Sequence, residues 1–249
     1  MTPNPPRAVA ILAWHKIGPP PADGWPTWNY VPEATFLAQL QCLQQDGFRV
    51  VTLAALLQGL DHPEQLPPRA ALLTFDDGYR SLRSVVAPLL QARGLPWTVF
   101  VPTDHVGGSN AFDQGAEPYE PICSWDDLRA IAACGASIAS HGASHRTFSA
   151  LEPEDLRAEL TRSRASLQQE LGQPVAALAF PFGDPGRDPE RTDQLLAACG
   201  YRAALRYKGG GLVLPTAARF QLPRIAMGPD TDLAAELAAL RAAVDRAPG

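Results

Sequence analysis

Ala71-Leu72-Leu73-Thr74-Phe75-Asp76-Asp77-Gly78 is the stretch of this sequence that decides the fold. The apolar run is typical of a buried strand, and Asp76, Asp77 and Gly78 stand where that strand would reach the surface. Ligands of α/β proteins bind at the carboxyl ends of the strands, so both carboxylates are predicted to lie where a site would form. The same residues also fit a solvated Asp-Gly turn, and alone they do not separate the two interpretations.

Apolar, strand-like runs alternate with amphipathic segments along the whole chain. Strands are expected at 9–14, 48–51, 71–75, 97–101, 137–140, 175–180, 201–205 and 220–226. Helices are expected at 32–47, 53–59, 80–93, 124–134, 152–171, 189–199 and 231–244. This alternation predicts an α/β fold with about seven parallel strands in a (β/α) barrel, complete or not. A single domain over 1–249 is expected, with its core at 9–226 and a closing helix at 231–244; a doubly wound open sheet is the alternative.

Composition narrows the class of partner. The 249 residues carry a net charge of −5 and no basic block, which excludes nucleic acid or an anionic membrane as the main partner and suits a neutral substrate such as a sugar. No apolar run reaches the ~18 residues of a membrane span. No signal peptide is visible, so the chain as it stands is expected in the cytoplasm, or outside it if the N-terminus was trimmed. Oligomeric state is left open.

The four cysteines form no C-x-x-C pair. Cys42, Cys123, Cys134 and Cys199 are far apart, which is typical of reduced core thiols rather than a zinc knuckle or a disulfide scaffold. In an oxidising compartment the four could still pair.

A second cluster, Ser140-His141-Gly142-Ala143-Ser144-His145, follows another predicted strand. The two imidazoles would converge on one point if the turn were helical; otherwise they are surface histidines in a polar turn. With Asp77 as third ligand they would form a divalent-metal site with open positions. Asp76 would then be free to act as a general base toward water.

A third cluster, Ala179-Phe180-Pro181-Phe182-Gly183-Asp184-Pro185-Gly186, is a Pro/Gly-rich turn after a strand. Such a turn can aim a backbone N–H into a site, as an oxyanion donor requires. Alone, it is more typical of a structural turn.

The three clusters together resemble the polysaccharide deacetylase family, the NodB-homology carbohydrate esterases. The motifs are Thr74-Phe75-Asp76-Asp77-Gly78, the six residues 140–145, and Phe180-Pro181-Phe182-Gly183, and the resemblance covers about 9–226. Leu12-Ala13-Trp14-His15-Lys16 is similar to the first strand of a subgroup that includes poly-N-acetylglucosamine deacetylases. The resemblance implies a distorted (β/α) barrel and metal-dependent removal of acetyl groups from an N-acetylated sugar, releasing acetate.

Roles for individual residues follow from the resemblance. It implies that Asp77, His141 and His145 hold a divalent metal, with zinc expected and cobalt, nickel or another divalent ion as alternatives. It also implies that Asp76 is the general base and that the Phe182 backbone N–H stabilises the oxyanion.

Two departures from the family pattern concern proton transfer. Many members carry an arginine before the proline of the third motif, where it orients the base, but here Ala179 and Phe180 precede Pro181. Many also carry a Leu-x-His near the C-terminus as general acid, and no histidine follows His145. His15 is a candidate acid, equally compatible with a structural histidine, and Asp76 could return the proton itself.

Substrate contacts are expected from Trp125, Pro181 and Arg224. For Trp125 the pattern favours core packing over a place at the rim. Arg224, on the last predicted strand, could meet an acidic group in the site, although a surface or barrel-bottom position is the more usual one. Further aromatic candidates for the rim of the site are Trp25, Trp28, Tyr30 and Tyr119. The expected function is a sugar N-deacetylase; a same-fold hydrolase of a non-sugar amide or ester, or a non-catalytic sugar-binding relative, are the alternatives.

Overall fold

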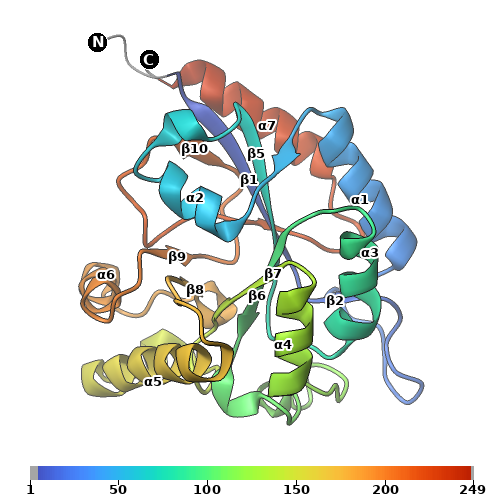
Figure 1. The fold of residues 1–249 in the computed structure, drawn as a ribbon, viewed down its shortest axis with the longest axis vertical. Coiled ribbons are helices and arrows are strands. Elements are labelled where there is room, and N and C mark those ends of the chain that lie inside the picture. The colour runs from blue at the N-terminus through green and yellow to red at the C-terminus, as the bar shows by residue number, and fades with distance from the viewer. Residues whose placement is uncertain (1–4, 248–249) are drawn as a thin grey trace.

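A curved sheet of nine strands forms the centre of the protein, whose computed structural model describes residues 5–247 (Figure 1). The strand order is β10-β1-β5-β6-β7-β8-β9, with β11 beside β1 and β4 beside β5. All neighbours are parallel except the antiparallel pair β1–β10. The strands of this sheet are β1 (Arg7–Trp14), β4 (Arg49–Val50), β5 (Arg69–Phe75), β6 (Trp97–Val101), β7 (Ala136–Ser140), β8 (Ala177–Ala179), β9 (Ala203–Leu205), β10 (Leu212–Leu214) and β11 (Ile225–Ala226).

Helices surround the strands. They are α1 (Glu33–Gln45), α2 (Leu53–Gly59), α3 (Ala87–Gln91), α4 (Trp125–Ala133), α5 (Pro153–Leu171), α6 (Pro189–Ala198) and α7 (Leu233–Arg246). Figure 1 shows α7, α1, α3, α4, α5 and α6 arranged as a ring around the sheet, with α2 in front of the strands. A separate two-stranded sheet joins β2 (Lys16–Ile17) to β3 (Tyr30–Val31).

The segment 222–226 connects the two edges of the sheet. Leu222 forms a parallel bridge with Leu205 of β9, and β11 then pairs with Leu12 and Ala13 of β1. The expected distorted barrel is therefore confirmed, and the open doubly wound sheet is not formed. This closing segment also carries Arg224 into the barrel.

Side chains of β5 alternate between two cores, as the two-residue period of a strand requires. Ala70 and Leu72 belong to an inner cluster that also includes side chains of α2, whereas Leu73 and Phe75 face the outer helices. Asp76 continues the inward series, which directs its carboxylate into the barrel.

Several element boundaries differ from those expected. The predicted strand at 220–226 is a strand only at Ile225–Ala226, because Pro223 has no N–H to give to a ladder. The predicted helix at 80–93 begins as a wide turn at Leu82–Val86 and becomes α-helical only at α3, where Pro88 stands in the first turn. The antiparallel strand β10 was not predicted.

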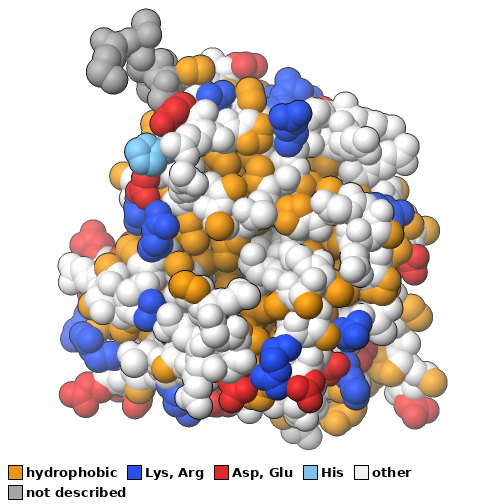
Figure 2. Space-filling view, in the orientation of Figure 1, with side chains coloured by type: hydrophobic (Ala, Val, Ile, Leu, Met, Phe, Trp, Pro, Cys, Tyr) orange, Lys and Arg blue, Asp and Glu red, His pale blue; other side chains and the backbone are white. Residues whose placement is uncertain are grey.

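The cysteines are unpaired, and charges of both signs are mixed on the face shown in Figure 2. All four cysteines are free thiols. Figure 2 shows acidic and basic side chains interspersed around one face, with no area where one sign gathers. Among the helices described, none is both long and apolar enough to cross a membrane.

Candidate active site and metal centre

Asp76 is held inside the barrel by Arg224. The guanidinium donates from Nη1 to Oδ1 at 2.8 Å and from Nη2 to Oδ2 at 2.7 Å, a two-pronged pairing that fixes the carboxylate plane. Arg224 also donates to the Thr74 hydroxyl at 3.1 Å and, from Nε, to the Arg206 carbonyl at 2.6 Å. The pair is buried, with Arg224 at 0% and Asp76 at 2% exposure.

This pairing sets the charge of Asp76. Burial raises the pKa of the carboxyl, but Arg224, His141 and His15 together outweigh it, so the net pKa is lowered. Asp76 is therefore an ionised carboxylate near neutral pH, as a base must be.

Arg224 is not among the residues that line the pocket, and its guanidinium nitrogens already donate to Asp76, Thr74 and the Arg206 carbonyl, so the predicted contact with substrate is not formed. Its position is instead that of a residue that orients Asp76. The arginine that is absent before Pro181 thus has a counterpart on the closing segment.

Asp77, His141 and His145 converge beside this pair. Asp77 Oδ1 lies 3.4 Å from His141 Nε2 and 3.1 Å from His145 Nε2, and one donor atom from each residue lies within 4.8 Å of the others. All three side chains are buried. Asp76 and Asp77, adjacent in sequence, therefore meet different partners.

Backbone conformation marks the same place. The non-glycine residues with positive φ among residues 5–247 are Asp77 (69°), His145 (60°) and Phe182 (57°). Left-handed backbone is uncommon for such residues and persists where the surroundings hold it, often at functional sites. All three come from the three motifs singled out by sequence.

The loop that carries the two histidines is not helical, contrary to the condition under which their convergence was expected. Glu159 of α5 holds it instead: its Oε1 accepts hydrogen bonds from the N–H of Ala143 (2.9 Å), the N–H of Ser144 and the Ser144 hydroxyl (2.8 Å). Sequence reasoning missed Glu159, although its place on the buried face of α5, beside Leu156 and Leu160, is an unusual one for a carboxylate.

The three side chains suit a divalent cation. Asp77 Oδ1 is buried and has no hydrogen-bond partner within residues 5–247, so it is an unsatisfied acceptor that a cation would satisfy. The Nδ1 of His141 is 2.8 Å from the Ala179 carbonyl, an arrangement that leaves Nε2 as the ligand atom. Two imidazoles and one carboxylate are a usual donor set for a divalent metal with open positions.

Burial and the contacts among Asp77, His141 and His145 also set the protonation states of Asp77 and His145. The pKa of Asp77 is held well below its usual range because His141 and His145 outweigh the effect of burial. Burial lowers the pKa of His145, so this imidazole is neutral near pH 7 and free to act as a ligand.

His15 and Phe182 complete the site. His15 follows β1, and its Nε2 lies 3.9 Å from Asp77 Oδ2. Its Nδ1 is buried and has no hydrogen-bond partner in the part of the chain that the structure describes. Phe182 follows the third motif's proline, and no hydrogen bond of its backbone N–H to another described residue is found. Its ring is 56% exposed and packs edge-on against His145 at 4.7 Å.

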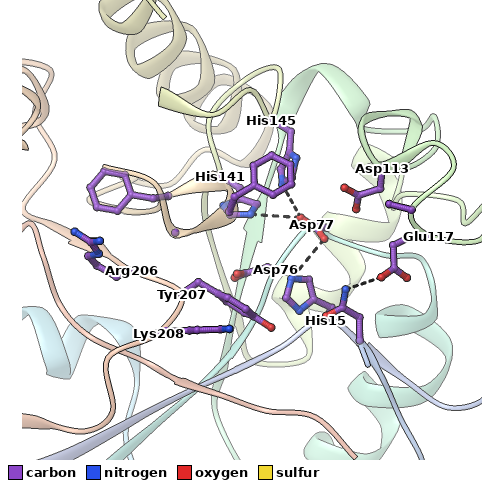
Figure 3. A pocket seen from close by; sticks show the side chains of 15 residues that line it. His15, Asp76, Asp77, Asp113, Glu117, His141, His145, Arg206, Tyr207 and Lys208 are labelled. Carbon is purple, nitrogen blue, oxygen red and sulfur yellow. Dashed lines mark hydrogen bonds and ion pairs between the residues drawn. The ribbon is translucent and has the colours of Figure 1, made fainter. Parts of the chain in front are cut away.

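These residues line a pocket of about 570 Å³ (Figure 3). Asp113 and Glu117 stand on one side of Asp77 in this view, and Tyr207 and Lys208 on the other. A second cavity of about 380 Å³ shares His145 and Phe182 with the first, so the two cavities adjoin at these side chains.

An enclosed ion pair fixes the acidic side of the pocket. Lys16 is 1% exposed, donates to Glu117 Oε2 at 2.6 Å and lies over the rings of Tyr30 (4.4 Å) and Tyr79 (4.5 Å). Glu117 also accepts from Thr27 and from Asn29 at 2.7 Å each. The long loop that carries Glu117 is therefore tied to the segment that follows His15.

Two further predicted substrate contacts are incorrect in position. Trp125 is the first residue of α4 and packs against the outer core, outside the residues that line the pocket. Pro181 is buried against Gly142, beneath the histidine loop. Of the proposed rim residues, Trp25, Trp28 and Tyr119 are exposed, whereas Tyr30 is buried under Lys16.

Comparisons with known proteins agree with this geometry. The family model described as polysaccharide deacetylase matches residues 64–204, more than half of the chain. YxkH of Bacillus subtilis (strain 168), whose name places it among polysaccharide deacetylases, is 23% identical over 205 residues, or 82% of this chain and 66% of that protein. A poly-beta-1,6-N-acetyl-D-glucosamine N-deacetylase of Escherichia coli (strain K12) is 28% identical over 135 residues, or 52% of this chain and 20% of that protein. The chain thus spans just under two thirds of the first relative and a fifth of the second.

Solved structures show the same fold. IcaB from Ammonifex degensii matches with a TM-score of 0.78 at 23% identity, covering 94% of this chain and 97% of that one. The deacetylase PplD of Streptococcus pyogenes, in complex with acetate, matches with a TM-score of 0.77 at 21% identity, covering 94% and 98%.

The contribution of the Arg224–Asp76 pair can be tested by measuring the stability of a variant that lacks the arginine. Arg224→Met leaves a buried carboxylate unpaired, so we expect the free energy of unfolding in urea at pH 7 to fall by about 3–5 kcal/mol. The loss should shrink as pH falls toward about 4, because the unpaired carboxyl can then take up a proton.

Two variants control this measurement. Adding Asp76→Asn to Arg224→Met should restore part of the stability, since no charge is then buried alone. Arg187→Met, at an exposed ion pair with Glu152, should change stability by about 0.5 kcal/mol or less. A double variant no more stable than Arg224→Met would contradict the pairing.

Proposed function

The chain belongs to the polysaccharide deacetylase family, and from that premise we propose that it is a metal-dependent hydrolase that removes N-acetyl groups from an N-acetylated sugar polymer and releases acetate. One observation carries the proposal: a buried Asp77–His141–His145 group lies in the same pocket as a separately held carboxylate, Asp76. The second cavity that adjoins this pocket at His145 and Phe182 supports a chain of sugars rather than a single small molecule.

Asp77, His141 and His145 are the residues proposed to hold the cation, and zinc is the proposed ion because nitrogen and oxygen donors in a site with open positions suit it. When bound, the ion would polarise the acetyl carbonyl and make water more acidic. The fixed Nδ1 of His141 and the hydrogen bonds of Glu159 to the loop would hold the ligands in place.

Asp76 is proposed as the general base. Arg224 keeps it ionised and fixes its orientation, so a carboxylate oxygen is available to accept a proton from the attacking water. The water oxygen then bonds to the acetyl carbon, and the carbonyl oxygen gains negative charge. The free N–H of Phe182 is proposed to donate to that oxygen.

His15 is proposed to complete the proton transfers. As the C–N bond breaks, its electron pair stays on nitrogen, and the amine needs one proton to leave. His15 lines the pocket, and its Nε2 lies 3.9 Å from Asp77 Oδ2, beside the proposed metal ligands. Asp76, having taken a proton from water, could supply it instead.

Acetate release tests the activity. Oligomers of N-acetylglucosamine should release acetate with the purified protein, and removal of metal by a chelator should lower the rate on the order of 100-fold or more, with recovery on adding zinc. A rate that is unchanged after complete metal removal would rule out the proposed metal dependence, and an absence of acetate from every acetylated sugar tested would rule out the activity.

His15→Gln tests the acid. For the amide substrate we expect kcat/KM to fall about 10²–10⁴-fold, the usual contribution of a positioned acid. An aryl acetate ester should be affected far less, because its phenolate leaves without a proton. Equal losses on amide and ester would show that His15 supports the structure of the site rather than protonating the amine.

A further inference from the structure

The wall that follows β9 presents unpaired hydrogen-bond donors to the pocket. Arg206, Tyr207 and Lys208 are consecutive and all line it. In Figure 3, Tyr207 and Lys208 extend from the left toward His15, whereas Arg206 lies farther out on that side, away from Asp77. Arg206 donates to Gln221 at 3.0 Å. Tyr207 and Lys208 are therefore the pair that faces a bound ligand.

The Tyr207 hydroxyl is a buried polar atom with no hydrogen-bond partner among the described residues. Its ring packs edge-on against His15 at 5.2 Å and lies 5.9 Å from the Arg224 guanidinium, so the phenol has a defined place beside the reacting groups. Burial raises the pKa of the phenol, which keeps it protonated as a donor. An unsatisfied donor in such a position indicates a ligand acceptor.

Lys208 adds a positive charge next to that donor. It is exposed, and no carboxylate within residues 5–247 forms an ion pair with it. The chain contains 19 arginines but only two lysines, so Lys208 is not one member of a lysine-rich surface. The other lysine, Lys16, is neutralised by Glu117 inside the opposite side of the pocket.

The opposite wall of the pocket, which includes Asp113 and Glu117, is acidic. Asp113 lines the pocket without an ion-pair partner among the described residues, and burial together with Asp77 and Glu117 raises its pKa to about 6. An anionic group on a ligand would be repelled from Asp113 and attracted to Lys208. The two walls therefore favour one orientation of a charged sugar chain.

We propose that Tyr207 and Lys208 form a subsite for a negatively charged substituent, a carboxylate or a phosphate, on the sugar chain next to the N-acetyl group. The substrate class is then an acidic N-acetylated glycan rather than a neutral polymer. This inference rests on the proposed function for the identity of the ligand as a glycan. Binding tests it separately from turnover.

Equilibrium binding provides the direct test. Three oligosaccharides of equal length are compared by calorimetry on zinc-loaded and on metal-free protein: neutral N-acetylglucosamine, N-acetylglucosamine alternating with glucuronate, and N-acetylglucosamine bearing phosphate esters. We expect the charged chains to bind about 10-fold more tightly than the neutral one, since a hydrogen bond to a charged group contributes that much. The preference should weaken as salt rises, and the two charged arms distinguish carboxylate from phosphate.

Variants assign the preference to the wall. Lys208→Gln should remove the preference for charged chains. Tyr207→Phe should lower the affinity for charged and neutral chains alike, because the phenol can donate to either. Arg187→Gln, which removes one positive charge from an exposed ion pair elsewhere, should leave the preference unchanged. Equal affinity of wild-type protein for all three chains, or a preference that survives in Lys208→Gln, would overturn the proposal.

Chemical labelling gives a readout that needs no variant. Because Lys16 is 1% exposed, reductive methylation should modify Lys208 in preference to Lys16, as resolved by peptide mass spectrometry. A bound charged chain should slow modification of Lys208 more than a bound neutral chain does at equal occupancy. Equal protection by both would count against the subsite. If the protein binds the charged oligosaccharides with this preference but releases no acetate, the proposed function is contradicted while the subsite remains supported.

Discussion

The buried pairing of Arg224 with Asp76 is the interaction on which both the site and its closure depend. The Arg224 guanidinium donates to Asp76 and Thr74 at the end of β5 and to the Arg206 carbonyl after β9. This one side chain therefore connects the segment that closes the barrel to the strand that carries the two acids. Burying a carboxylate is costly unless it is paired, and Arg224 is the partner that offsets this cost for Asp76. The adjacent acids consequently differ: Asp76 is satisfied by arginine, while Asp77 is left with an unpaired oxygen among imidazoles.

Maintaining this arrangement requires strained backbone, and the surrounding structure compensates for it. Left-handed conformations at Asp77, His145 and Phe182 cost on the order of 1–3 kcal/mol each. Glu159 offsets part of that by accepting hydrogen bonds within the histidine loop, and Lys16 with Glu117 fixes the loop opposite. Within residues 5–247, the non-glycine residues with left-handed backbone thus all belong to the three motifs, each of which follows a strand of the parallel sheet.

The sequence predicted most of the parallel strands, and it placed Asp77, His141 and His145 at one edge because carboxyl ends of parallel strands meet there. The helical turn on which the convergence of the two histidines was expected is not formed. The sequence named Arg224 as able to meet an acidic group, but it did not predict the pairing with Asp76 or the role of Glu159. Arg224 lies on an irregular segment interrupted by Pro223, where no two-residue period indicates which way a side chain points. Glu159 did leave a signal, a carboxylate on the apolar face of α5. The pairing of Lys16 with Glu117 joins residues about a hundred positions apart, and only the folded structure brings them together.

The central claim is that two neighbouring carboxylates have separate tasks, one toward a metal and one toward a proton. The most direct measurement is zinc stoichiometry together with acetate release in Asp76→Asn and Asp77→Asn. The account predicts that Asp76→Asn retains one zinc per chain while acetate release falls on the order of 100-fold or more, and that Asp77→Asn loses both. Full activity in Asp76→Asn, or zinc retained undiminished in Asp77→Asn, would contradict it.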